Sequence, residues 1–210
     1  MTKPARLGVF GGTFDPIHIG HLIAAAEAMH SFSLDRVLFV PAGRPWQKDS
    51  FSEAEDRYTM TVLGTAAHER FAVSRTEVDR TGPTYTADTM EGLRDFYGSG
   101  TGLYFIIGAD AVQKVDTWRG VERLVGLAEF IAVARPGAGN TLHPLNTSIL
   151  VHKLAIPGVD ISSTDVRARV ADGRPIDFLV PAPVARYIRR SGLYGAEREA
   201  GSVDEGRAKG

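Results

Sequence analysis

The chain has 210 residues, of which 43% are hydrophobic and 23% are charged, and its 24 basic residues nearly balance its 25 acidic ones. This size and composition suit a globular α/β protein of one ordinary domain or two small ones. The charge balance argues against a general nucleic-acid or membrane surface, which needs a basic excess. The absence of cysteine excludes disulfides, thiolate zinc sites and cysteine nucleophiles.

Targeting and membrane segments are not expected. The apolar stretch near the N-terminus is too short for a signal peptide, and no apolar run approaches the length of a membrane span. We therefore expect a cytoplasmic protein with no membrane partner and no nucleic-acid partner. The sequence leaves open whether the chain forms a homo-oligomer.

Six short runs rich in β-branched and aromatic residues predict β-strands. Most are continuous in apolar residues, which is typical of strands buried on both faces of a parallel sheet. The predicted strands are residues 7–10, 36–40, 71–74, 103–107, 129–134 and 149–156.

Helical segments lie between and after these runs. The first is rich in alanine, the second opens with serine and acidic residues, and the last two end near glycines that suit a helix end. The predicted helices are residues 21–32, 52–68, 86–97, 121–128, 163–173 and 181–194.

The alternation of strand and helix, without an internal repeat, predicts an α/β fold. We expect a Rossmann-like, doubly wound parallel sheet with helices on both faces, formed by residues 1–194. Residues 134–144 are expected to form a long surface loop. The tail 195–210 lacks apolar periodicity, so we expect it to be disordered.

The stretch GVFGGTFDPIHIGH, from Gly8 to His21, predicts an anion site where the first strand meets the first helix. Its glycine pair lets the backbone approach a ligand closely. The start of the following helix offers unpaired N–H groups and a positive dipole. His18 and His21 are three residues apart, so in a helical turn both can face one ligand. Imidazoles that donate hydrogen bonds or carry charge suit a polyphosphate.

This spacing has other interpretations. Two histidines three residues apart can also be core or surface residues, or part of a metal site. No acidic or third histidine neighbour supports a metal, so zinc is not expected. The loop lacks the Lys-Ser/Thr of a Walker A motif and does not match G-x-G-x-x-G.

The stretch GGTFDPIHIGH (11–21) resembles the signature of the nucleotidyltransferase superfamily that is built on a His-x-Gly-His motif. Its members move AMP or CMP onto a phosphate without a covalent intermediate. Further stretches, in the family's order, make the chain similar to the bacterial nicotinate-mononucleotide adenylyltransferases. They are FVPAGRPWQK (39–48), GPTYTADTM (82–90), FIIGADAVQKVDTW (105–118), ISSTDVR (161–167) and YIRRSGLY (187–194).

The chain departs from the family at one visible place. Trp46-Gln47-Lys48 stands where the family often has Pro-His-Lys. Lys48 is kept, but any role usually given to that histidine is in doubt here.

The resemblance implies transfer of AMP from ATP to nicotinate mononucleotide in NAD biosynthesis, giving nicotinate adenine dinucleotide and pyrophosphate. Mg²⁺ is expected to arrive on ATP rather than at a metal site of the protein. The implied catalytic residues are His18, His21 and Arg167. The implied substrate-binding residues are Gly11, Gly12, Thr13, Phe14, Asp15, Lys48, Thr84, Tyr85, Thr86, Gly108, Asp110, Trp118, Arg135, Ile161, Ser162, Ser163 and Thr164.

Within this set, the resemblance implies that Trp118 stacks on the pyridine ring beside Thr86. The residues alone allow simpler roles. Ser162 and Asp165 have the spacing of a helix cap, Trp118 suits plain core packing, and Arg135 suits a solvated surface.

Two other functions compete. Phosphopantetheine adenylyltransferases and glycerol-phosphate cytidylyltransferases share the first signature, but they lack the combination of TYTADT with GAD and the following tryptophan. A nucleotide sensor without turnover is the alternative from another class. The intact phosphate clamp of His18, His21 and Arg167 argues against a sensor.

Overall fold

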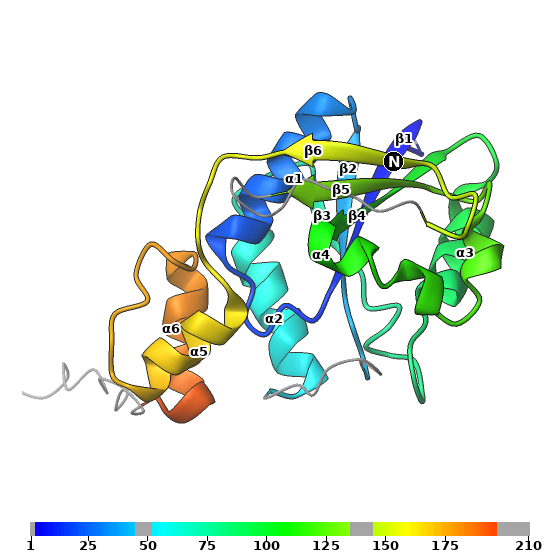
Figure 1. Ribbon diagram of the computed structural model, residues 1–210. Helices are drawn as coiled ribbons and strands as arrows, with labels where there is room; N and C mark the ends of the chain where they lie inside the picture. The colour runs from blue at the N-terminus through cyan, green and yellow to red at the C-terminus, as the bar shows by residue number, and fades with distance from the viewer. Residues whose placement is uncertain (1–2, 45–51, 135–144, 197–210) are drawn as a thin grey trace, which may run out of the picture.

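A computed structural model of the chain describes residues 3–44, 52–134 and 145–196 (Figure 1). Its strands form one parallel sheet in the order β3-β2-β1-β4-β5-β6. Each strand pairs with its neighbours in parallel, as Phe10 does with Phe39 of one strand and Ile106 of another. The strands are β1 (Arg6–Gly12), β2 (Arg36–Pro41), β3 (Phe71–Val73), β4 (Gly102–Gly108), β5 (Glu129–Ala134) and β6 (Val151–Ala155).

The order of the strands confirms the predicted Rossmann-like, doubly wound fold. The winding runs from β1 outward to β3, then returns to start again at β4 on the other side of β1. Ligands in such sheets bind beyond the carboxyl ends of the strands, at the point where the winding reverses. The strand order therefore predicts a ligand site at the loops that follow β1 and β4.

Helices connect the strands and cover both faces of the sheet (Figure 1). Residues 86–97 form a helix with the predicted bounds. The α-helices are α1 (Ile19–Ser31), α2 (Ala54–Thr65), α3 (Thr86–Tyr97), α4 (Ala109–Val112), α5 (Ser163–Ala171) and α6 (Ala182–Ser191), and the 3₁₀ helices are η1 (Val115–Thr117), η2 (Val121–Leu124) and η3 (Leu193–Gly195). The longest, α1, has 13 residues, so no helix of the described parts reaches the length of a membrane span.

The predicted helix 121–128 is wrong. The structure has a single 3₁₀ turn, Val121–Leu124, in its place. Gly120 and Gly126 flank this turn with left-handed φ angles of 73° and 72°. Such angles end a right-handed helix, and they leave too few residues between them for an α-helix of ordinary length.

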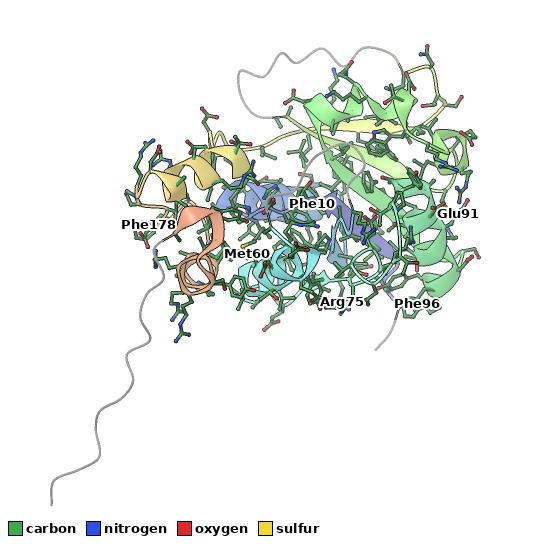
Figure 2. All side chains as sticks on the ribbon, turned by 90° about the horizontal axis from the view of Figure 1, so that it is seen from below. Phe10, Met60, Arg75, Glu91, Phe96 and Phe178 are labelled. Atoms are coloured by element: carbon green, nitrogen blue, oxygen red, sulfur yellow. The ribbon has the colours of Figure 1, made fainter. Side chains whose placement is uncertain are left out.

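Two apolar clusters fill the space between the sheet and its helices. Successive strand residues point to opposite faces, so Val9 joins one cluster and Phe10 the other. The Phe10 cluster takes residues from α1, α2, α5 and α6, whereas the Val9 cluster takes residues from α3, α4, η1 and η2. Figure 2 shows Phe10 and Met60 inside the molecule and Phe178 at its periphery. Burial on both faces explains why the strands read as continuous apolar runs.

Arg57 in α2 is a buried cation that ties together loops at the carboxyl edge of the sheet. Its side chain is 1% exposed. It donates to the carbonyl oxygens of Thr13 (3.2 Å), Gly43 (2.8 Å) and Ser52 (3.3 Å), and also to that of Ala42. Burial lowers the pKa of this guanidinium, and the charge of Asp15 opposes that shift. The loops after β1 and β2 are thus joined to α2 through one side chain.

Arg57→Met is expected to destabilise the fold strongly. Methionine has a similar length but no donors, so four carbonyl groups lose a partner, two of them in buried hydrogen bonds. Each loss at a buried group costs about 1–3 kcal/mol. We expect the free energy of unfolding, measured by denaturant titration, to fall by about 3 kcal/mol or more. Arg186→Met, on an exposed position of α6, is the matched control and should change it by less than about 0.5 kcal/mol. Similar values for the two variants would contradict a structural role for Arg57.

Candidate active site

A pocket of about 560 Å³ opens where the winding of the sheet reverses. It is lined by the end of β1 and the loop that follows it, the start of α1, the end of β4, the segment after β6 and the start of α5. Its place is the one that the strand order predicts for a ligand.

The pocket brings together most of the residues singled out from the sequence. It is lined by the whole predicted catalytic set and by most residues of the first signature and of ISSTDVR. The predicted residues that line it are Gly11, Gly12, Thr13, Phe14, Asp15, His18, His21, Gly108, Asp110, Ile161, Ser162, Ser163, Thr164 and Arg167.

Of the remaining six predicted residues, four lie outside this pocket and two are not described by the structure. Thr84, Tyr85, Thr86 and Trp118 do not line this pocket. Lys48 and Arg135 lie outside the described residues, as do nearly all of the predicted loop 134–144 and of the tail 195–210.

The two histidines form a stacked pair at the start of α1. Their ring centroids are 3.7 Å apart, with 27° between the ring planes. His18 is the N-cap of α1 and is 6% exposed. Phe14 packs edge-on against the ring of His21 at 5.1 Å. The pair is therefore fixed by packing, and it faces the pocket.

A main-chain bond fixes how His21 presents its proton. The N–H of His18 donates to Nδ1 of His21 at 3.2 Å. Because Nδ1 accepts this bond, neutral His21 carries its proton on Nε2 and offers that nitrogen as a donor. An anion that contacts both rings can accept hydrogen bonds from their N–H groups. The pair is suited to a phosphate whose negative charge grows.

Gly20, which the sequence analysis did not select as a site residue, makes room for the His18 ring. A Cβ at Gly20 would lie 3.0 Å from Nδ1 and 3.1 Å from Cε1 of that ring. Gly20 also lines the pocket. The signal was present in the sequence, since Gly20 is the glycine of the His-x-Gly-His motif.

Gly20→Ala is expected to reduce turnover without destabilising the protein. Alanine is the better helix former by about 1 kcal/mol, but its methyl group would push the His18 ring, which cannot move freely against His21. We expect kcat to fall about 10-fold, because small displacements of a reacting group are costly. Gly92→Ala in α3 is the control, since a Cβ there meets nothing within 4 Å. Equal kcat values for the two variants would contradict this role of Gly20.

The start of α5 supplies the second wall of polar groups. Ser162 is its N-cap, and its side chain accepts from the N–H of Asp165 at 3.0 Å, which confirms the predicted cap. Arg167 Nη1 donates to the carbonyl oxygen of Asp15 at 2.7 Å, and Nη2 donates to Thr164 Oγ1 at 3.2 Å. The N-termini of α1 and α5 thus both face the pocket, and their dipoles add to the charge of Arg167.

The residues predicted for the acceptor lie around the start of α3. Thr86 is its first residue, and Tyr85 is its N-cap. Tyr85 accepts a hydrogen bond from Arg119 at 3.2 Å, and the guanidinium lies 4.9 Å from its ring centroid. Thr84 is buried, and its hydroxyl bonds to the carboxyl group of Glu77. Burial raises the pKa of that carboxyl, against the effect of the hydrogen bonds that it accepts.

Trp118 packs against the sheet rather than in the pocket. Its ring meets Phe105 edge-on, with centroids 5.9 Å apart and planes at 90°, and it also contacts Phe130. Its Nε1 is buried and has no hydrogen-bond partner in the described parts of the chain. A buried indole N–H without a partner is costly. A substrate group that accepted from this N–H would remove that cost.

Metal ligands do not gather anywhere in the described residues. No group of three or more His, Cys, Asp or Glu side chains there could hold a metal ion. Asp15 and Asp110 are the carboxylates that line the pocket, and the carboxylate of Asp15 is engaged with hydroxyl groups.

Comparisons with known proteins show the family of the chain. A model of the cytidylyltransferase-like family matches residues 9–169. A probable nicotinate-nucleotide adenylyltransferase of Saccharopolyspora erythraea is 50% identical, over 98% of this chain and 97% of that protein. One of Leifsonia xyli is 52% identical, over 90% of this chain and 94% of that protein.

The fold also matches a solved structure. Plasmodium falciparum nicotinic acid mononucleotide adenylyltransferase, complexed with NaAD, superposes with a TM-score of 0.74 at 19% identity, over 92% of this chain and 99% of that one. The chain therefore belongs to the cytidylyltransferase-like family, and its close sequence relatives place it among the nicotinate-nucleotide adenylyltransferases.

Proposed function

We propose that this chain transfers AMP from ATP to nicotinate mononucleotide and releases pyrophosphate. A 5′-phosphate oxygen of the mononucleotide attacks the α-phosphorus of ATP in line. The bond from the α-phosphorus to the bridging oxygen breaks, and the electron pair leaves with pyrophosphate. The product is nicotinate adenine dinucleotide. Because the attacking phosphate is already an anion near pH 7, no general base is needed.

Catalysis then rests on positioning and on charge stabilisation. The observation that supports this most directly is the convergence of His18, His21 and Arg167 on one pocket with two helix N-termini. These groups would hold the α-phosphate and the departing pyrophosphate. Lys48, whose place the structure does not describe, would add a further positive charge. Mg²⁺ enters as part of the substrate, on ATP.

The acceptor would bind toward the start of α3. Thr86 begins that helix, and the main-chain N–H groups at a helix start can donate to an anionic group of the acceptor. The unpartnered Nε1 of Trp118 supplies a further donor on the same side of the sheet, in the cluster that α3 covers.

Product analysis tests the proposal. The protein is incubated with Mg-ATP and a panel of phosphorylated acceptors: nicotinate mononucleotide, nicotinamide mononucleotide, phosphopantetheine and glycerol 3-phosphate. We expect nicotinate adenine dinucleotide and one equivalent of pyrophosphate, identified by mass. An adenylylated product formed only with phosphopantetheine or glycerol 3-phosphate, or ATP binding without turnover for any acceptor, would contradict the proposed function.

A further inference from the structure

The C-terminal segment from α5 to η3 forms hydrogen bonds with the loop of residues 13–18, called the signature loop here, and with the residue that follows it. Ser163 Oγ donates to the carbonyl oxygen of Pro16 at 2.9 Å, and the N–H of Ile19 donates to that of Leu179 at 2.9 Å. These bonds join the one from Arg167 described above. In Figure 1, α5 and α6 stand beyond the arrowheads of β5 and β6. The shape of the signature loop therefore depends on a segment more than 140 residues away in the sequence.

The Asp15 carboxylate is the buried acceptor of the signature loop. Asp15 is 2% exposed and also lines the pocket. Its Oδ1 accepts from Ser52 Oγ at 2.5 Å and from the Tyr194 hydroxyl at 2.6 Å. Ser52 precedes α2 and Tyr194 lies in η3, so the two donors are 142 positions apart in the sequence. A buried charge needs such donors to remain where it is.

The backbone of Tyr194 has an unfavourable conformation. Its φ of 59° and ψ of 23° are left-handed, which is uncommon for a bulky residue. Such a conformation persists where the surroundings determine it, and it is found most often at functional sites. The hydroxyl also lies 3.9 Å from Met60 Sδ. Burial raises the pKa of this phenol, so it serves as a donor and not as an anion.

We propose that Tyr194 is a positioning residue, whose hydroxyl keeps the Asp15 carboxylate beside α2 and thereby holds the signature loop in the shape that places His18 and leaves Arg167 to the phosphates. The inference rests on the proposed adenylyl transfer. Tyr194 itself does not line the pocket, so it would act through Asp15 alone.

The physical reason is competition for Arg167. That guanidinium already lies 2.7 Å from the main-chain carbonyl oxygen of Asp15. Without the phenol, the carboxylate loses one of its donors. Arg57 also lies near Asp15, but its donors are occupied by four carbonyl oxygens, so Arg167 is the cation that can replace the lost donor. Arg167 would then be paired with Asp15 instead of with a substrate phosphate, and the loop that ends at His18 would shift with it.

The test compares Tyr194→Phe with Tyr187→Phe. Tyr187 in α6 donates to Asp56 Oδ1 at 2.7 Å, so both substitutions remove one phenol that is bonded to an aspartate, but the Tyr187 pair does not line the pocket. kcat and KM for ATP are measured with nicotinate mononucleotide, below the unfolding temperature of each variant. We expect kcat/KM to fall about 10-fold or more for Tyr194→Phe and to stay within about two-fold for Tyr187→Phe, whose effect is limited to stability.

Two further variants separate positioning from simple loss of packing. Ser52→Ala removes the other hydroxyl from Asp15 and should lower kcat/KM in the same direction, so the inference can be judged even if Tyr194→Phe folds poorly. In an Asp15→Ala background, adding Tyr194→Phe should change kcat/KM by less than about two-fold, because the acceptor through which it acts is gone.

The outcomes are distinguishable. A wild-type chain that forms no dinucleotide contradicts the proposed function and, with it, this inference. An active wild type for which Tyr194→Phe and Tyr187→Phe have equal kcat/KM contradicts the inference alone. Full additivity of Tyr194→Phe with Asp15→Ala would also overturn it, because Tyr194 would then act independently of the carboxylate.

Discussion

His18→Ala is expected to lower kcat by about 10²–10³ while changing the affinity for ATP far less. The ring of His18 faces the pocket from the N-cap of α1, where the main chain of the variant can still begin the helix. A donor that is bonded more strongly as charge develops acts on the transition state, and losing one such donor typically costs about this factor.

The measurement is steady-state kinetics at saturating substrates, together with a direct binding titration of ATP. His30→Ala is the matched control, since it removes an exposed histidine from the other end of the same helix and should leave kcat unchanged. Near-normal turnover of His18→Ala would show that the His18 ring serves only to pack against His21.

Nicotinate mononucleotide is expected to be preferred over its amide, by up to about 10⁴ in kcat/KM. A site that offers only N–H donors satisfies both oxygens of a carboxylate. The NH₂ group of the amide would face a donor and find no acceptor there. The start of α3 at Thr86 and the unpartnered Nε1 of Trp118 are donors of this kind. The nearby carboxyl of Glu77 is occupied by the hydroxyls of Thr84 and Thr89.

The two mononucleotides are compared under identical Mg-ATP. Trp118→Phe keeps an aromatic ring but removes the Nε1–H donor, so the ratio of the two kcat/KM values should narrow while KM for ATP stays the same. Equal values for the acid and the amide in the wild type, or a preference for the amide, would show that the predicted donor-only pocket is wrong.

The sequence predicted the sheet and the first half of the site because both depend on local patterns. Residues 129–134 and 86–97 have the predicted bounds, and the loop from Gly11 to His21 lies where a strand–glycine–helix order must place it. The short turns after β4 were not predicted, because α4 and η1 have only four and three residues and lack a helical period.

The supports of the site could not be read from the sequence. Ser52 and Tyr194 meet Asp15 across 37 and 179 positions, and no local pattern marks such a pair. Arg57 was hidden for another reason, since arginine in a helix normally lies at the surface. Its burial becomes evident only when the loops after β1 and β2 are placed around it.

That arginine has a consequence for how the protein fluctuates. Local opening of a loop usually needs only the loss of its own few contacts. Here the backbone at Thr13 cannot swing away without leaving a buried cation short of an acceptor, and the same cation holds Ala42 and Gly43. The backbone at Thr13, Ala42 and Gly43 is therefore expected to open together with the start of α2 rather than one residue at a time. Because Thr13 lines the pocket, this part of the pocket wall resists local opening.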